Sequence, residues 1–484
     1  MSVYGDIRGR SHPASAPRHS SPKPPLPALS DFVRGCFASL LCFGLLFHSV
    51  AASADSLTDA LGHAYAANPD LQAERAKLRA IDEQISQALA KMRPTLNVTA
   101  SAQKQRSVDH TNGDYGYGLN TKTTSVEVTQ PIYKGGSIQS DISGAQNRIL
   151  AERAILLSTE QTTLLAAASA YMDVLRDQMT LEQINNYQRT LQTQYEIQKR
   201  RLLIGENTKT DVSQAEARLA QAMSDRLQYE ATLRASSSNY ARIIGSDPFN
   251  LANPKISLSI PANIDDIVEL ARTSNPDVIA ARYQELSARN DVESIDGGLL
   301  PSVDAVGNVS RSWNPSTTQT MLDSASIMLR MTVPLDNGSV ASRARGARQT
   351  VSQMMMQTES AQRKAVDMAL RSWNFLMAVR SQIRAGEAAI RAVNETLMSL
   401  RTEVNVGSRT VTDLLNAEQE ALSSRLGLIN SKHDEVVWSF TLLSSIGRLT
   451  AQNINLSVDY YDYAKHYDEI RGKLWGVSLG KDPK

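Results

Sequence analysis

The sequence predicts a mainly α-helical protein with a smaller β component, built as two copies of one unit. Two long stretches contain no proline, one between Pro131 and Pro248 and the other between Pro334 and Pro483. Such stretches allow helices longer than a compact domain uses. In addition, residues 57–94 align with residues 264–301 at one offset (264 − 57 = 207). Self-similarity at a period of about 205 residues indicates a tandem internal duplication.

The composition is that of long helices, and it excludes one class of partner. The chain has 484 residues, of which 42% are hydrophobic and 5% aromatic, and its formal net charge is +1. Low aromatic content with abundant alanine, leucine and glutamine favours long helices over a compact α/β core. A nucleic-acid-binding surface needs a clear basic excess, so we expect no nucleic acid partner.

Residues 1–54 have the features of a secretory signal peptide with a long lead rich in proline and serine. Arg34 precedes a short apolar run that contains both cysteines and ends in the small-residue site Ala52-Ser53-Ala54. Gly44 and His48 interrupt this run, which favours cleavage after Ala54 over a membrane anchor. The mature chain would then have no cysteine and form no disulfide. We therefore expect an exported protein.

The first repeat is expected to span residues 55–245. Its helical pattern is broken at Asn68-Pro69, where the proline suits the first turn of a second helix. The apolar residues then change from a period of 3.6 to a period of 2, which predicts strands at 95–106 and 122–131. A long helical hairpin follows, with its tip near residue 205.

The first helix of this hairpin has a heptad pattern. Apolar residues occupy the expected positions, with Gln161 as the polar exception: Leu150, Ala154, Leu157, Leu164, Ala168, Tyr171 and Leu175. This spacing predicts a coiled-coil seam. A helix over residues 137–203 would be about 100 Å long at ~1.5 Å per residue.

The second half of the chain repeats this order after a proline-marked linker. The expected segments are the linker 246–263, a second repeat over 264–450, strands at 302–311 and 325–334, a hairpin with its tip near 407, and a C-terminal tail over 451–484. The tail is polar and rich in tyrosine, and it shows no clear periodicity.

The two hairpin tips share a short sequence pattern. Residues 204–216 match residues 406–418 at a constant offset (406 − 204 = 202), and six residues are identical. Gly205 and Gly407 can adopt the positive φ that ends a helix. Thr208-x-x-Asp211 and Thr410-x-x-Asp413 are capping-box patterns for the helices that follow. Both segments are therefore predicted to be hairpin turns.

The four predicted strands cannot close a β-barrel within one chain. Strands of about ten residues with one apolar face, in an exported protein, fit the strands of outer-membrane barrels. Lipid does not tolerate open strand edges, so closure requires several chains. Because the smallest such barrels have about eight strands, at least a dimer is needed, and three chains would supply twelve. The alternative is a soluble four-stranded sheet packed on helices.

The ordered set of these features resembles the TolC family of outer-membrane export ducts over residues 56–451. The resemblance rests on the Asn-Pro-Asp helix starts at Asn68 and Asn275, the strand pairs that end at Pro131 and Pro334, and the two tips. It implies a homotrimer with a 12-stranded barrel in outer-membrane lipid and a periplasmic α-barrel of long coiled-coil helices. An equatorial layer would hold the linker and the tail.

The same resemblance implies the partners and the location. The partners would be an inner-membrane efflux or ABC transporter and a periplasmic adaptor protein. The protein would lie in the outer membrane and extend into the periplasm. It would carry drugs and other toxic compounds, or proteins, and the sequence leaves the choice of cargo open.

By position, the resemblance places a periplasmic constriction at the second tip. Arg409 matches the arginine of the family's closing network, Asp413 matches the first constriction aspartate, and Asp211 matches its partner from the first tip. Two positions depart from the family pattern. Asn416 stands in place of the second constriction acid, and Val404 stands in place of a tyrosine.

These acidic residues also have a local explanation. Asp211 and Asp413 suit helix N-termini, where the helix dipole favours negative charge. Repeated around a three-fold pore, Asp413 would form an acidic ring that favours cations. Arg409 precedes the cap and has no capping role, so an ion pair with Asp211 would explain it, and a solvated surface arginine is the alternative. We hypothesise that Arg409 and Asp211 help to hold a closed state.

No motif indicates catalysis, a cofactor or a metal. The mature histidines occur singly rather than with metal-ligand spacing, at His63, His110, His433 and His466. We therefore expect no enzyme activity. The remaining alternative is a periplasmic coiled-coil adaptor, which shares the long hairpin and the signal peptide. An adaptor would need one hairpin flanked by two halves of a β-domain, rather than two hairpins that each follow a strand pair.

Overall fold

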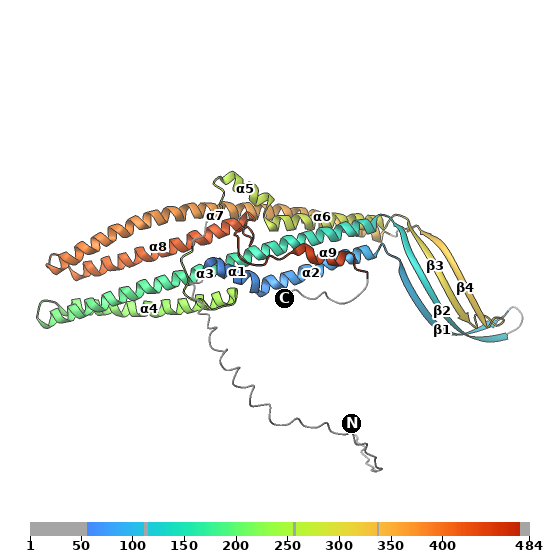
Figure 1. Cartoon of the computed structure of the whole chain (residues 1–484), viewed down its shortest axis with the longest axis horizontal. Coiled ribbons are helices and arrows are strands. Elements are labelled where there is room, and N and C mark those ends of the chain that lie inside the picture. Colours follow the sequence, from blue (N-terminus) through green and yellow to red (C-terminus); the bar gives the residue numbers. More distant parts are fainter. Residues whose placement is uncertain (1–55, 111–114, 255–257, 336–337, 475–484) are drawn as a thin grey trace, which may run out of the picture. The chain divides into compact units, whose positions relative to one another are not determined.

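The computed structural model describes residues 56–110, 115–254, 258–335 and 338–474 (Figure 1). The predicted signal peptide and its cleavage site lie outside the described residues. The same is true of the last ten residues of the predicted tail, 475–484.

Two series of six elements follow one another in the same order: two short helices, two strands, one long helix and its return helix. The first series is α1 Leu57–Ala67, α2 Pro69–Ala90, β1 Thr95–Asp109, β2 Tyr115–Lys134, α3 Ser137–Leu203 and α4 Lys209–Ile244. The second is α5 Ile264–Thr273, α6 Pro276–Gly297, β3 Ser302–Trp313, β4 Met321–Thr332, α7 Ser339–Asn405 and α8 Val411–Ser445. The helix α9, Tyr463–Arg471, comes last. The helices α3 and α7 have 67 residues each, or about 100 Å at ~1.5 Å per residue.

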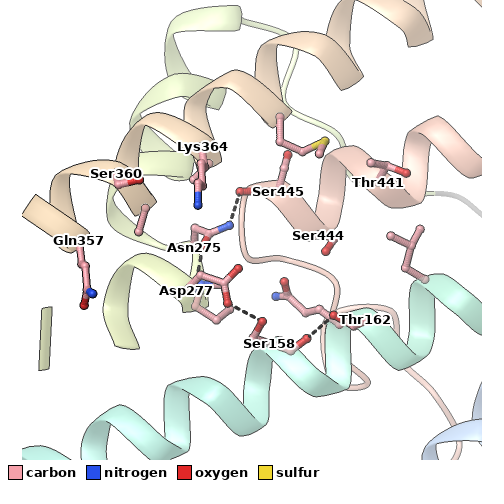
Figure 2. A pocket seen from close by; sticks show the side chains of 16 residues that line it. Ser158, Thr162, Asn275, Asp277, Gln357, Ser360, Lys364, Thr441, Ser444 and Ser445 are labelled. Atoms are coloured by element: carbon pink, nitrogen blue, oxygen red, sulfur yellow. Dashed lines mark hydrogen bonds between the residues drawn. The ribbon is translucent and has the colours of Figure 1, made fainter. Parts of the chain in front are cut away.

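The two Asn-Pro-Asp sequences start helices α2 and α6 and also attach them to the return helices. The Asn68 side-chain oxygen accepts from the backbone N–H of Asp70 at 3.0 Å, and its amide donates to the Ile243 carbonyl of α4 at 3.2 Å. Asn275 donates in the same way to the Ser445 carbonyl of α8 at 2.9 Å (Figure 2). Because both asparagines are buried, each satisfies its polar groups through the cap and the neighbouring helix end.

The main hydrophobic core surrounds the middle of α3, which contacts α1, α2, α4, α6 and α8. The heptad seam is only partly buried within the chain. Leu164 and Tyr171 are fully buried, whereas Leu150 and Leu157 remain half-buried. Gln161 is 2% exposed, and its Nε2 has no hydrogen-bond partner among the described residues. The large apolar residues of the predicted seam are therefore buried in the main core and only half-buried closer to the strands.

The strands form one antiparallel sheet in the order β1-β2-β3-β4. The four predicted strands come as two hairpin pairs, and the pairing of β2 with β3, with Val126 opposite Val309, joins the two pairs into this sheet. The strands β1, β2 and β3 run beyond the predicted ends, while β4 begins earlier and ends earlier. A β-bulge lies between Pro131 and Tyr133, where proline cannot donate a ladder hydrogen bond.

The two faces of the sheet differ in chemistry. The register brings apolar residues of all four strands to one face, and they are exposed: Leu96, Val98, Val126, Val128, Val309, Ile327, Leu329 and Met331. We call this the apolar face. The opposite, polar face carries mainly serine, threonine, asparagine and glutamine. On β2 the apolar face is the more exposed one.

The tail contains a helix, α9, that the sequence analysis did not predict. It packs on α2. The Arg153 guanidinium of α3 lies over the rings of Tyr463 and Tyr467, at 5.3 and 5.2 Å from their centroids. His466 Nδ1 is 3.3 Å from Asp82 Oδ2. These cation–π and hydrogen-bond contacts hold α9 against α2 and α3.

Candidate constriction at the two hairpin tips

Both hairpins end their first helix with the same backbone motif. Gly205 and Gly407 have φ of +78° and +76°. At the first tip, the N–H of Gly205 donates to Leu202 at 3.1 Å and the N–H of Glu206 donates to Arg201 at 3.0 Å. The second tip has the matching pair of bonds. These bonds define a Schellman motif, which requires the left-handed conformation that glycine adopts at low cost.

Each return helix begins with a capping box. Thr208 Oγ1 accepts from the N–H of Asp211 at 3.2 Å, and the Asp211 carboxylate accepts from the N–H of Thr208 at 3.1 Å. Thr410 and Asp413 repeat this arrangement at 3.1 and 3.2 Å. Hydrogen bonds from the side chain and then the backbone of Thr410 hold the pKa of Asp413 below its usual value. Asp413 is therefore ionised at neutral pH.

Within the chain, Arg409 and Asp211 have other partners. Arg409 Nε pairs with Glu403 Oε2 of α7 at 3.2 Å, and both side chains are more than 40% exposed. Asp211 is engaged by its own capping box. The hypothesised pair between Arg409 and Asp211 is absent from the ion pairs among the described residues of one chain.

Two hydrogen bonds join the hairpins near their tips instead. Thr412 Oγ1 donates to Gln214 Oε1 at 3.0 Å, and Arg218 Nη2 donates to Asn416 Oδ1 at 3.3 Å. Both bonds link α4 to α8 at one offset (412 − 214 = 198 and 416 − 218 = 198), as expected for two helices that leave the tips side by side.

Sequence reasoning placed Asn416 at the constriction but missed Gln214 and Arg218. One signal was available, because Asp211, Gln214 and Arg218 are spaced i, i+3 and i+7 on α4 and therefore share a helix face. That spacing does not say which helix lies opposite. At position 416, the side-chain amide oxygen of Asn416 accepts a hydrogen bond from Arg218.

The second tip also contains a buried carboxylate. Glu418 is 5% exposed, and its carboxylate accepts from Arg401 Nη2 at 2.7 Å. Val404 is buried in a small cluster within the same hairpin, with Leu397 and Leu414. Position 404 therefore holds a core residue whose side chain has no hydrogen-bonding group.

Farther from the tips, His433 joins the second hairpin to the first. Its Nε2 lies 2.9 Å from Asp173 Oδ1 of α3, and its Nδ1 lies 2.8 Å from Asp434 Oδ1. Burial alone would lower the pKa of His433, but the hydrogen bonds to the two carboxylates outweigh it and raise the pKa above its usual value. Arg176 Nη1 pairs with the same Asp173 at 2.9 Å.

The described residues contain no cluster of three or more histidine, cysteine or acidic side chains that could hold a metal ion. Across the same part of the chain, no helix combines the length and the apolar character needed to cross a membrane.

The family model described as "Outer membrane efflux protein" matches residues 60–246 and 267–448. These segments make up well over half of the chain. The chain belongs to the outer membrane efflux protein family. The two matched segments coincide with the two series of elements described above.

Curated relatives extend over nearly the whole of this efflux protein. The outer membrane efflux protein BepC of Brucella suis is 28% identical over 447 residues, which cover 91% of this chain and 96% of BepC. TolC of Vibrio cholerae is 25% identical over 423 residues, covering 84% and 94%. The proteases secretion protein PrtF of Dickeya chrysanthemi is 24% identical over 450 residues, covering 86% and 93%.

Solved structures show the same fold. The outer membrane protein VceC of Vibrio cholerae superposes with a TM-score of 0.72 at 18% identity, covering 81% of this chain and 96% of VceC. The CmeC outer membrane channel of Campylobacter jejuni gives a TM-score of 0.73 at 12% identity, covering 86% and 89%. The mainly helical fold with a small antiparallel sheet is therefore that of TolC-like channels.

Family membership confirms the predicted TolC-type resemblance, location and role. This efflux protein lies in the outer membrane and extends into the periplasm. Its family is one of export channels rather than enzymes or periplasmic adaptors.

Proposed function

We propose that three copies of this chain form a continuous export duct. The observation that carries the proposal is the sheet. Among the described residues, β1 and β4 each pair with one neighbour only, so both outer edges have unpaired backbone groups. Because lipid does not tolerate such edges, β4 of one copy pairs with β1 of the next. Three copies of four strands give a 12-stranded barrel (3 × 4 = 12).

The apolar face supports this arrangement because its ends carry aromatic residues. Tyr133 lies at the helix-proximal end and is 48% exposed, and Trp313 lies at the loop-proximal end and is 38% exposed. Aromatic girdles at both edges of an apolar band are typical of outer-membrane barrels. The apolar face is then the lipid side, and the polar face lines the pore.

The helical hairpins form the periplasmic part of the duct. Each protomer contributes α3–α4 and α7–α8, which we interpret as products of a tandem duplication of units 55–245 and 264–450. The half-buried Leu150 and Leu157 are available for contacts with a neighbouring copy. The linker 246–263 and the tail from residue 451 form an equatorial layer, and residues 1–54 act as a cleaved signal peptide.

An inner-membrane efflux or ABC transporter supplies the cargo, and a periplasmic adaptor joins it to the hairpin tips. The relatives support both cargo classes, because BepC is named an efflux protein and PrtF a proteases secretion protein. The duct carries toxic compounds or proteins according to its transporter, and no nucleic acid.

The tips close the periplasmic end. Asp413 is half-buried at the start of α8 and ionised, so three copies form an acidic ring that favours cations. Asn416 adds no charge to this ring. Arg409 is held by an exposed pair with Glu403, and such pairs are worth at most ~1 kcal/mol. Arg409 can therefore exchange to Asp211 of a neighbouring copy in the closed trimer.

Outer-membrane fractionation and planar-bilayer recording test the proposal. We expect a heat-modifiable trimer in the outer-membrane fraction that forms a low-conductance, cation-selective channel. Arg409→Ala should raise the single-channel conductance, whereas Arg391→Ala, an exposed arginine of α7 away from the tip, should leave it unchanged. A carbonate-extractable monomer would contradict the duct. Unchanged conductance in a folded Arg409→Ala trimer would contradict the gate alone.

A further inference from the structure

Among the side chains that the structure describes, the charged residues of the loop-proximal half of the sheet lie on one face. The apolar face carries Lys104, Arg106, Lys122, Arg311 and Asp323 there, by the register that places Val98, Val126, Val309 and Ile327 on the same side. Among the described side chains, the polar face of this half has only uncharged residues; its charges, Glu127, Asp304 and Arg330, lie nearer the helices.

This placement is unusual for a lipid-facing surface. A lysine or arginine on the lipid side costs about 2–4 kcal/mol at the bilayer midplane and falls to about 0–1 kcal/mol near the interface. Lys104 is six residues beyond Val98 along β1, which corresponds to roughly 20 Å of strand. Lys122 is the register partner of Trp313, the aromatic residue that marks the band edge. The basic side chains therefore lie at the headgroup level.

Among the described side chains, only part of this charge is paired with an opposite charge. Arg311 forms two bonds with Asp323, at 2.6 and 2.7 Å. Lys104, Arg106 and Lys122 are exposed and form no ion pair with any acidic side chain that the structure describes. We call these three residues the basic belt. Three cations that lie close together at a lipid interface, without an ion pair among the described residues, attract anionic headgroups.

We propose that the basic belt binds the phosphate groups of a phosphorylated glycolipid in the outer leaflet. The inference rests on the proposed barrel, since only that assembly sets the apolar face against lipid. The strands meet the helices at one end of the sheet and the two loops lie at the other, so periplasmic helices put the belt on the outer-leaflet side. Arginine and lysine at this level match phosphate by charge and by hydrogen-bond donors.

Lipid A binding to the purified full-length trimer, counted by native mass spectrometry, tests this inference. The variant carries Lys104→Gln, Arg106→Gln and Lys122→Gln together. The matched control is Arg330→Gln, an exposed cation on the polar face of the same sheet. We expect the triple variant to bind bis-phosphorylated lipid A at least about tenfold more weakly, and the control to bind like wild type. Dephosphorylated lipid A should bind equally to all three proteins.

The outcomes separate this inference from the duct itself. Equal lipid A binding by wild type and triple variant, in trimers that conduct normally, would overturn the basic belt and leave the duct standing. Displacement of lipid A by inorganic phosphate would assign the residues to free phosphate instead. The triple variant could also form less trimer while each folded trimer still binds lipid A like wild type. That result would overturn the basic belt and show that the cations pair with a neighbouring copy. Absence of a conducting wild-type trimer would contradict the duct.

Discussion

Glu216 and Glu418 occupy matched positions of the two hairpins but have different surroundings. Glu216 is exposed, whereas Glu418 is 5% exposed and accepts from Arg401 at 2.7 Å. The position matching Arg401 in the first hairpin is Lys199 (401 − 202 = 199), whose ammonium lies over the Tyr195 ring. The two tips thus share one backbone motif while their side-chain partners differ.

This difference shows which contacts of the tips depend on neighbouring residues and which depend on tertiary packing. The Schellman motif and the capping box close within six residues, so identical residues produce the same turn at both tips. Glu418 pairs with Arg401 on the other helix of its own hairpin, whereas Asn416 and His433 each bond to a residue of the first hairpin. We expect substitutions of the residues shared by the two tips to lower the local stability of both tips equally. Substitutions of the residues with tertiary partners should lower the stability of one tip only.

The largest effect is expected for Arg401→Gln, which removes the charged partner of a buried carboxylate. Loss of a charge-assisted hydrogen bond should lower the local opening free energy of the second tip by about 2 kcal/mol. The matched control Lys199→Gln should change the first tip by less than ~0.5 kcal/mol. Amide hydrogen exchange of peptides from each tip measures both values. Equal effects at the two tips would contradict the assigned role of Glu418.

A smaller and symmetric effect is expected for Thr208→Ala and Thr410→Ala. Each removes the side-chain acceptor of a helix N-cap, so each should destabilise its return helix by about 1 kcal/mol. Thr210→Ala, in the first turn but outside the cap, serves as the control. Hydrogen exchange over the first turns of α4 and α8 is the measurement. A response at only one tip would show that packing, rather than capping, sets the local stability there.

The smallest effect is a pH dependence present only in the second hairpin, because the position matching His433 is Ala231 (433 − 202 = 231). The pKa of His433 is raised in the folded protein. The charged histidine therefore stabilises the fold fully at pH values below the unfolded pKa of about 6.5. This stabilisation is lost as the pH rises through the folded pKa. Wild type should therefore have a higher Tm than His433→Gln at about pH 5.5, and this advantage should shrink by about pH 8.5. A constant Tm difference across this range would contradict the charged bridge to Asp173.

The sequence alone was sufficient for the long helices and their ends. Helix α3 spans the same residues that the proline-free heptad run predicted, because helix hydrogen bonds and caps involve residues at most a few positions apart. The apolar strand faces were also readable, since a period of two sets them locally. The strand ends were not, because pairing with a neighbour extends a strand beyond its own pattern.

Only the tertiary structure decided which distant segments meet. The pairing of Val126 with Val309 unites strands 183 residues apart (309 − 126 = 183), and no local pattern encodes that choice. The same holds for the bond from Arg218 to Asn416 and for the docking of α9 by Arg153. Local patterns specify each element, but the partner of a buried or paired side chain depends on how the elements pack against one another.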